Sequence, residues 1–177
     1  MTPTSKIGIL GGSFNPPHLG HVGICRYVLE QKKVDEVWVI PCFEHPFDKP
    51  LVSFDHRFKM CELTFKEFDD KAVVKDVEKQ LGGKSFTLRT VQFLKKENPK
   101  LEFFLILGED AAKEAKTWHQ YDKLKKAVSW LIIPRGPESP VPDVSATDIR
   151  KILQEGKNVG KYLPQLVYQY IVQNRLY

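Results

Sequence analysis

The chain has 177 residues, of which 42% are hydrophobic, 28% charged and 11% aromatic. This globular composition excludes a disordered, collagen-like or disulfide-rich chain and favours one compact domain over residues 1–177. The 27 basic and 22 acidic side chains give a net charge of +5, which a solvated lysine-rich surface explains as well as an anionic partner does. No apolar run is long enough for a membrane span. Cys25, Cys42 and Cys61 form no CxxC pair, so we expect reduced thiols in a cytoplasmic protein.

Short apolar runs alternate with helical patterns along the chain. We expect strands at Lys6–Leu10, Glu36–Ile40, Ala72–Val77, Leu101–Leu107 and Val128–Ile133. We expect helices at residues 22–33, Phe54–Phe65, Ser85–Lys96, Thr147–Gln154 and Leu163–Asn174, and a Lys/Ala-rich helix after residue 110. Continuous apolar strands are typical of a sheet covered on both faces. The sequence therefore predicts a doubly wound, Rossmann-like parallel α/β sheet of five or six strands with C-terminal helices.

The loop after the first expected strand reads GGSFNPPHLGH, from Gly11 to His21. Ligands of parallel sheets bind beyond the carboxyl ends of the strands, so this loop is the expected binding site. Its glycines admit a ligand close to the backbone, and the helix that follows offers free N–H groups and a positive dipole end to an anion. His18 and His21 are three residues apart, so they face the same side and can donate hydrogen bonds to phosphate oxygens.

Two other interpretations of this loop stay open. The histidines could lie on the surface after an ordinary glycine turn, or they could bind a metal, although zinc would need a third protein ligand. The loop matches neither GxxxxGK[ST] nor GxGxxG, which disfavours a P-loop and a nicotinamide dehydrogenase.

A second segment, VSATDIR from Val144 to Arg150, also opens a helix. Its hydroxyls and backbone N–H groups can bind an anion, and Arg150 lies on the same helical face as Thr147. Alone, the segment is an N-cap followed by a surface arginine. Together with the first loop, it predicts two phosphate-binding segments that meet at one edge of the sheet.

These two segments resemble the (H/T)xGH and ISSTxIR signatures of the nucleotidyltransferase superfamily, and the proline-histidine form is most similar to the bacterial nicotinate-nucleotide adenylyltransferase family. The resemblance continues through KPLVSFDHRFKM, SFTLRTVQFL, LILGEDAAKEAKTWHQYDKL and YLPQLVYQYIVQNRLY. It implies transfer of the adenylyl group of ATP to nicotinate mononucleotide, with Mg²⁺ held by the triphosphate and water and no protein metal ligand. The residues that it places at ATP are Gly11, Gly12, Ser13, Phe14, His18, His21, Gly108, Asp110, Ser145, Thr147 and Arg150. Of these, His18, His21 and Arg150 are the expected catalytic residues.

The resemblance also implies an acceptor site. Trp118 would stack on the pyridine ring, Thr87 would bind its carboxylate, and Lys49 and Arg57 would bind the acceptor phosphate. Each has an ordinary structural alternative: a core tryptophan, a helix cap, or two solvated charges.

This chain departs from the family pattern at three places. Asn15 replaces the usual aspartate, and Ala146 lacks the second hydroxyl of the serine-threonine signature. Residues 44–49 replace the usual Pro-Pro-His-Lys, which leaves nicotinamide mononucleotide or phosphopantetheine open as the acceptor. A non-catalytic nucleotide-binding module and a homo-oligomer also stay open. Scattered basic residues without a groove-reading motif argue against nucleic acid as a partner.

Overall fold

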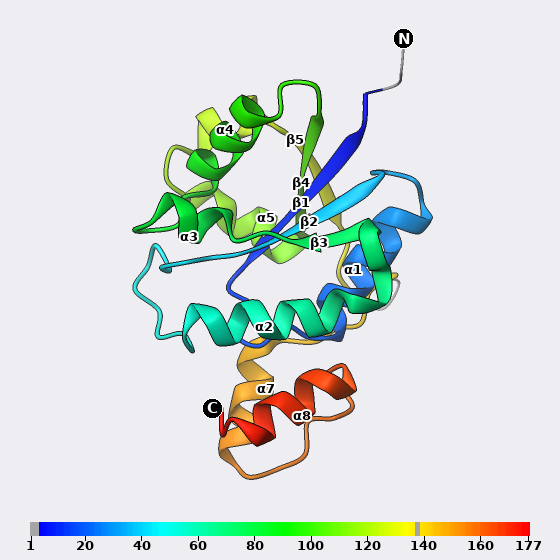
Figure 1. Cartoon of the computed structure of the whole chain (residues 1–177), viewed down its shortest axis with the longest axis vertical. Helices are drawn as coiled ribbons and strands as arrows, with labels where there is room; N and C mark the ends of the chain where they lie inside the picture. Colours follow the sequence, from blue (N-terminus) through cyan, green and yellow to red (C-terminus); the bar gives the residue numbers. More distant parts are fainter. Residues whose placement is uncertain (1–3, 137–138) are drawn as a thin grey trace.

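A five-stranded parallel sheet forms the centre of the computed structural model, which describes residues 4–136 and 139–177. The strand order is β3-β2-β1-β4-β5, so the predicted doubly wound fold is confirmed (Figure 1). The strands are β1 (Lys6–Gly12), β2 (Glu36–Pro41), β3 (Ala72–Val74), β4 (Glu102–Gly108) and β5 (Ser129–Ile133). The α-helices are α1 (Leu19–Glu30), α2 (Phe54–Phe65), α3 (Val77–Leu81), α4 (Thr87–Glu97), α5 (Glu109–Glu114), α6 (Tyr121–Ala127), α7 (Ala146–Gln154) and α8 (Gln165–Gln173). Two 3₁₀ turns lie at Lys66–Lys71 and Ala115–Thr117.

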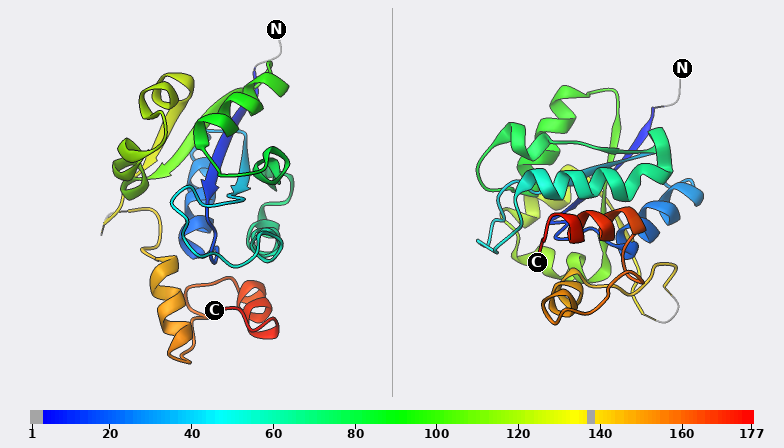
Figure 2. Two further views of the ribbon diagram at one scale, coloured as in Figure 1. Left: turned by 90° about the vertical axis from the view of Figure 1, so that its left-hand side faces the viewer. Right: turned by 60° about the horizontal axis from the view of Figure 1, so that its bottom comes forward.

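Helices cover both faces of the sheet (Figure 2). Along β2, Val37 and Val39 pack into the core beneath α1 and α2, whereas Trp38 and Ile40 pack into the core beneath α3, α4 and α6. This alternation explains why the strands read as continuous apolar runs: odd and even positions are both buried, but against different helices. Within the described residues, no helix combines the length and the apolar character that a membrane span requires.

Two predicted elements differ from the structure. The strand expected at Ala72–Val77 ends at Val74, because Asp76 takes the N-cap position and Val77 begins α3. Glu78 then lies in the first turn of α3, where an acidic group suits the helix dipole. The single helix expected after residue 110 is two helices, since Gln120 adopts a left-handed conformation, with φ of 55°, at the start of α6. The proline-rich segment 134–142 forms no helix or strand in its described part, and residues 137 and 138 lie outside it.

The C-terminal helices α7 and α8 lie beyond the carboxyl ends of the strands (Figure 1). Met60 of α2, Ile149 of α7, and Val167 and Ile171 of α8 are buried in one cluster there. This packing fixes the start of α7 close to the loop that follows β1.

Arg57 of α2 connects three loops at the same edge. Its side chain is only 1% exposed, and its guanidinium donates to four backbone carbonyls. Nε donates to Val52 O at 2.8 Å, Nη1 to Ser13 O at 2.9 Å and Cys42 O at 2.7 Å, and Nη2 to Phe43 O at 3.2 Å. The fork of donors on arginine suits this divergent set of acceptors, which a lysine ammonium could not satisfy from one position.

We expect Arg57→Met to lower the free energy of unfolding by about 3–5 kcal/mol, because four buried carbonyls lose their donor. Urea denaturation measures the change. Arg26→Met is the matched control, since Arg26 pairs with Glu67 on the surface and its loss should cost below about 1 kcal/mol. Equal losses in the two variants would contradict this account of Arg57.

Candidate active site

The candidate site lies where the strand order reverses, between β1 and β4. In open parallel sheets this switch point is the usual place for a ligand, because the connections leave in opposite directions and open a crevice. Gly12 ends β1 and Gly108 ends β4, so these two glycines, both expected to contact ATP, border the crevice. A methyl group added at Gly11 would meet nothing within 4 Å, so the backbone there is open to a ligand.

His18 and His21 stack on each other at the start of α1, with ring centroids 3.8 Å apart. The backbone N–H of His18 donates to Nδ1 of His21 at 3.1 Å. Because that nitrogen accepts, the proton of a neutral His21 ring is on Nε2, which is then a hydrogen-bond donor. Gly20 makes the stacking possible, since a Cβ at this position would lie 2.9 Å from Nδ1 of His18.

Both histidines are held neutral. Burial, followed by the nearby charge of Arg135, lowers the pKa of His18 from 6.5 to about 3. The pKa of His21 is also well below its ordinary value, because of burial, then His18, then Arg135. The pair therefore offers neutral donors at physiological pH.

The two predicted phosphate segments meet, as expected. Nη1 of Arg150 donates to the backbone oxygen of Asn15 at 2.7 Å, and Nη2 donates to Oγ1 of Thr147 at 3.2 Å. Ser145 is the N-cap of α7, and its hydroxyl accepts from the backbone N–H of Thr147 at 3.2 Å. The capping interpretation of Ser145 is thus correct, and the same cap brings the second segment against the first loop.

Arg135 is a residue that the sequence analysis missed. It lies two residues after the end of β5, at the carboxyl edge, where its guanidinium is 3.4 Å from Asp110 and 3.2 Å from Asp143. Its charge contributes to the lowered pKa values of both histidines. The signal was available, because a charged residue just after a strand of a parallel sheet faces the ligand edge.

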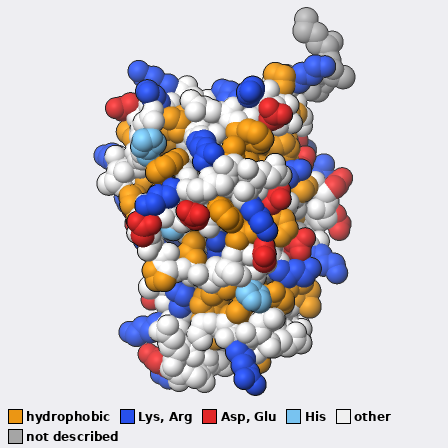
Figure 3. Space-filling model, turned by 60° about the vertical axis from the view of Figure 1, so that its left-hand side comes forward, with side chains coloured by type: hydrophobic (Ala, Val, Ile, Leu, Met, Phe, Trp, Pro, Cys, Tyr) orange, Lys and Arg blue, Asp and Glu red, His pale blue; other side chains and the backbone are white. Residues whose placement is uncertain are grey.

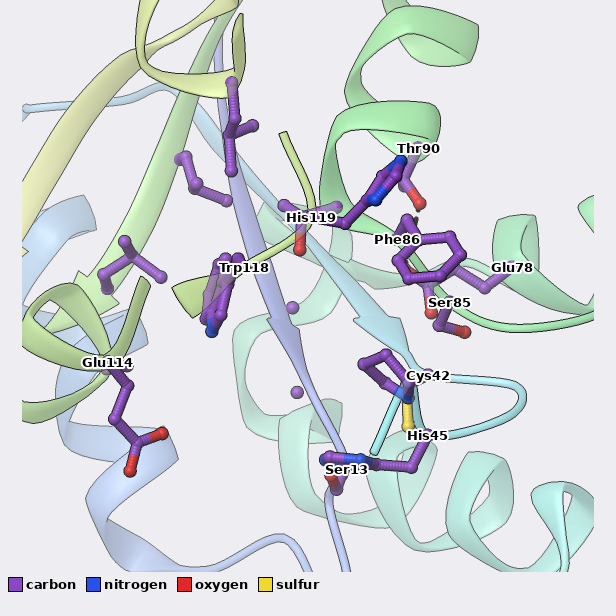
Figure 4. A pocket seen from close by; sticks show the side chains of 18 of the residues that line it. Ser13, Cys42, His45, Glu78, Ser85, Phe86, Thr90, Glu114, Trp118 and His119 are labelled. Atoms are coloured by element: carbon purple, nitrogen blue, oxygen red, sulfur yellow. Dashed lines mark hydrogen bonds between the residues drawn. The ribbon is translucent and has the colours of Figure 1, made fainter. Parts of the chain in front are cut away.

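A cavity of about 530 Å³ adjoins the first loop. Gly11, Gly12 and Ser13 line it, so the loop that leads to His18 also forms one of its walls. In Figure 4, Trp118 stands on one side of the cavity and Phe86 on another, with Ser13, Cys42 and His45 at one end. A cavity of this size with aromatic walls suits a flat heterocycle.

Three of the four expected acceptor residues border this cavity. Trp118, Thr87 and Lys49 all line it. Thr87 does not cap α4, because Phe86 holds the N-cap position. Arg57 differs from its expected placement: its side chain is buried behind the cavity wall, and backbone carbonyls take up its donors.

Phe14 and Asp110, two of the residues expected to contact ATP, each contact another residue of the site. The ring of Phe14 is buried against His21, with centroids 4.8 Å apart, so it supports the histidine pair from the core side. The φ of Phe14 is 46°, a strained value for a side chain of this size, and such strain often accompanies functional loops. Asp110 is exposed and forms an ion pair with Arg135.

Charges of both signs are mixed on the face of the molecule that Figure 3 shows. On the face in Figure 3, basic side chains lie among acidic ones, and no broad blue patch covers that side. This distribution agrees with a site that binds a small anion in a crevice rather than a long polyanion.

The family comparisons agree with this geometry. Residues 9–152 match the cytidylyltransferase-like family. A relative from Anaeromyxobacter dehalogenans, named probable nicotinate-nucleotide adenylyltransferase, is 33% identical over 100% of this chain and 99% of its own length. A relative of the same name from Bacillus pumilus is also 33% identical, over 97% of this chain and 98% of its own.

Solved structures show the same fold. The nicotinic acid mononucleotide adenylyltransferase of Plasmodium falciparum, solved in complex with NaAD, superposes with a TM-score of 0.81 at 22% identity and covers 97% of each chain. The full-length sequence similarity, the matching fold and the joined signature segments lead to one conclusion: this chain belongs to the nicotinate-nucleotide adenylyltransferase family, within the cytidylyltransferase-like nucleotidyltransferases.

Proposed function

We propose that this protein transfers the adenylyl group of ATP to nicotinate mononucleotide in NAD biosynthesis. The phosphate oxygen of the acceptor attacks the α-phosphorus of ATP, the bond from that phosphorus to the bridging oxygen breaks, and pyrophosphate leaves. The observation that carries the proposal is that one loop joins two features: its Gly11–Ser13 part lines the aromatic-walled cavity, and its continuation carries the paired histidines and contacts Arg150. Such a reaction needs positioning and charge stabilisation rather than a protein nucleophile.

On the ATP side, the neutral histidines donate hydrogen bonds to phosphate oxygens. His21 donates through Nε2 to the α-phosphate, where negative charge develops, and His18 lies beside it. Arg150, with Thr147 and the backbone N–H groups of α7, binds the β- and γ-phosphates. The open backbone of the first loop and Gly108 contact the nucleotide, and Asp110 binds its ribose. Arg135 adds a second fixed positive charge near the phosphates.

Magnesium enters this site with the nucleotide. Among the described residues, no three His, Cys, Asp or Glu side chains form a group that could hold a metal. Mg²⁺ retains several waters and often binds through substrate phosphates, so a site without a protein cage suits it. When bound, the ion would neutralise charge on the phosphates.

On the acceptor side, Trp118 stacks on the pyridine ring and Lys49 contacts the acceptor phosphate. Thr87, at the start of α4, donates its hydroxyl to the ring carboxylate. Arg57 acts indirectly in this proposal, because it fixes the loops at Cys42, Phe43 and Val52 around the cavity. The three cysteines are buried free thiols, which supports a reducing compartment, the cytoplasm, as the place of action.

We expect His21→Ala to lower kcat by roughly 10²–10³, the usual effect of losing one transition-state donor. Steady-state pyrophosphate release measures the change. His56→Ala is the control, since His56 contacts Tyr170 in α8 and not the histidine pair. Near wild-type turnover in His21→Ala would refute the assigned donor.

The lowered pKa of His18 predicts a pH dependence of stability. Between pH 6.5 and about 3, the unfolded chain binds a proton on this ring that the folded chain excludes, so the free energy of unfolding falls as pH falls. From pH 6.5 to 5 the loss should reach about 2 kcal/mol for this group. We expect His18→Gln to lose less stability than wild type in urea denaturation at pH 5 relative to pH 7. The same pH dependence in both proteins would contradict a neutral, buried His18.

We expect Trp118→Ala to raise the KM for nicotinate mononucleotide about fivefold while the KM for ATP stays nearly unchanged, because a stacking contact is worth about 1 kcal/mol. Trp118→Phe keeps a ring at this position and should recover much of the affinity. A rise in the KM for ATP alone would contradict the assignment of Trp118 to the acceptor site.

Wild type should prefer nicotinate over nicotinamide mononucleotide by at least about tenfold in kcat/KM, since a carboxylate can accept from both the Thr87 hydroxyl and nearby backbone N–H groups, whereas an amide NH₂ would face those N–H groups unpaired. Thr87→Val should reduce this preference. Equal use of the two acceptors by wild type would reject the carboxylate assignment and leave adenylyl transfer in place.

A further inference from the structure

Asn15 is the junction of three separate segments of the chain. Its Oδ1 accepts from the backbone N–H of Val52 at 3.1 Å and lies 2.9 Å from the hydroxyl of Tyr177. Its backbone oxygen accepts from Arg150 at 2.7 Å. Because a backbone N–H can only donate, the amide atom that faces Val52 is the oxygen, and the Tyr177 hydroxyl must then be a donor to it. The side chain of Asn15 thus has a fixed orientation.

Tyr177 reaches this junction from the far side of the C-terminal helices. It follows α8 in a left-handed conformation with φ of 75°, and its neighbours include the cluster formed by α2, α7 and α8. Burial raises the pKa of its phenol, so the hydroxyl stays protonated and keeps its role as donor. Arg150 and Arg57 are the charged groups near it, and neither of them can accept this proton.

The junction also continues toward the acceptor cavity. Val52, which donates to Asn15, accepts from Arg57 through its carbonyl at 2.8 Å. A continuous series of hydrogen bonds therefore joins Tyr177 to Asn15, Val52 and Arg57. Asn15 lies between the cavity-lining Ser13 and the catalytic candidate His18. A displacement of Asn15 would move both sides of the site together.

We propose that Tyr177 is a positioning residue for adenylyl transfer: by donating to Asn15, its hydroxyl fixes the loop that presents His18 and the carbonyl that orients Arg150. The expected effect on the rate rests on the proposed function. The coupling between Tyr177 and the loop does not depend on that function. Tyr177 is not among the residues that line the acceptor cavity. Its effect therefore appears in the alignment of reacting groups, where displacements near 1 Å are costly, rather than in acceptor affinity.

The test compares Tyr177→Phe with Tyr170→Phe. Both changes remove one phenol hydroxyl from the C-terminal part of the chain, but the hydroxyl of Tyr170 lies 2.9 Å from Nδ1 of His56, away from the loop. We expect Tyr177→Phe to lower kcat about tenfold, with the acceptor KM changed less than about twofold. Tyr170→Phe should keep the kcat of wild type. Melting temperatures of the two variants should agree, since each loses one partly buried hydrogen bond.

A double-mutant cycle separates positioning from general destabilisation. On an Asn15→Ala background, Tyr177→Phe should cause little further loss of kcat, because its acceptor is already gone. Equal kcat values in Tyr177→Phe and wild type, or fully additive losses in the cycle, would overturn the proposal.

Amide hydrogen exchange tests the coupling between Tyr177 and the loop without relying on catalytic activity. Tyr177→Phe should speed exchange at the amides of Ser13, Phe14, Asn15 and His18 and at Val52, whereas Tyr170→Phe should not. Exchange unchanged at these amides would overturn the inference. A wild type that forms no dinucleotide from ATP and any nucleotide acceptor would instead reject the proposed function, so the two failures remain distinguishable.

Discussion

The buried guanidinium of Arg57 is the interaction on which the arrangement of the site depends. A sheet can only bring the ends of its strands to one edge, and the loops beyond them need their own connections. Arg57 supplies these by donating to carbonyls that follow β1, follow β2 and precede α2. Its cost of desolvation is offset by four acceptors at short distance, and removing it would leave them unsatisfied in the interior. The wall of the cavity and the first loop are thereby held as one unit.

The two imidazoles at this edge are kept neutral. Burial of the rings, and then the nearby charge of Arg135, disfavour imidazolium and lower the pKa of His18 and of His21. Fixed guanidinium charges and neutral donors therefore lie together at this edge of the sheet. In the proposed reaction phosphate charge develops among them, and neither has to reorganise. The Gly11–Ser13 segment also borders the cavity with apolar and aromatic walls that we propose for the acceptor. One short loop would then contact both substrates.

The fold could be predicted from the sequence because the β-strands are unbroken apolar runs, and the two signature segments were correctly expected to meet at one edge of the sheet. Other features of the site depend on contacts between residues far apart in the chain, which no local sequence pattern contains. The pattern of Arg57 is the same whether it binds a ligand or four carbonyls, and only its burial distinguishes the two. The end of β3 differs from its prediction because Val77 suits a strand as well as the first turn of a helix, and the side chain of Asp76 makes no capping hydrogen bond that would mark the boundary. Arg135 belongs to no motif, although its place two residues after β5 is informative.

The most direct measurement is product identification after incubation of the purified protein with ATP, Mg²⁺ and each of three acceptors: nicotinate mononucleotide, nicotinamide mononucleotide and phosphopantetheine. The geometry of the cavity and the histidine pair predicts nicotinic acid adenine dinucleotide from the first acceptor, with one pyrophosphate released for each dinucleotide formed. The nicotinamide form should react slowly and phosphopantetheine should not react. Pyrophosphate release without any dinucleotide, or product from phosphopantetheine alone, would contradict this assignment.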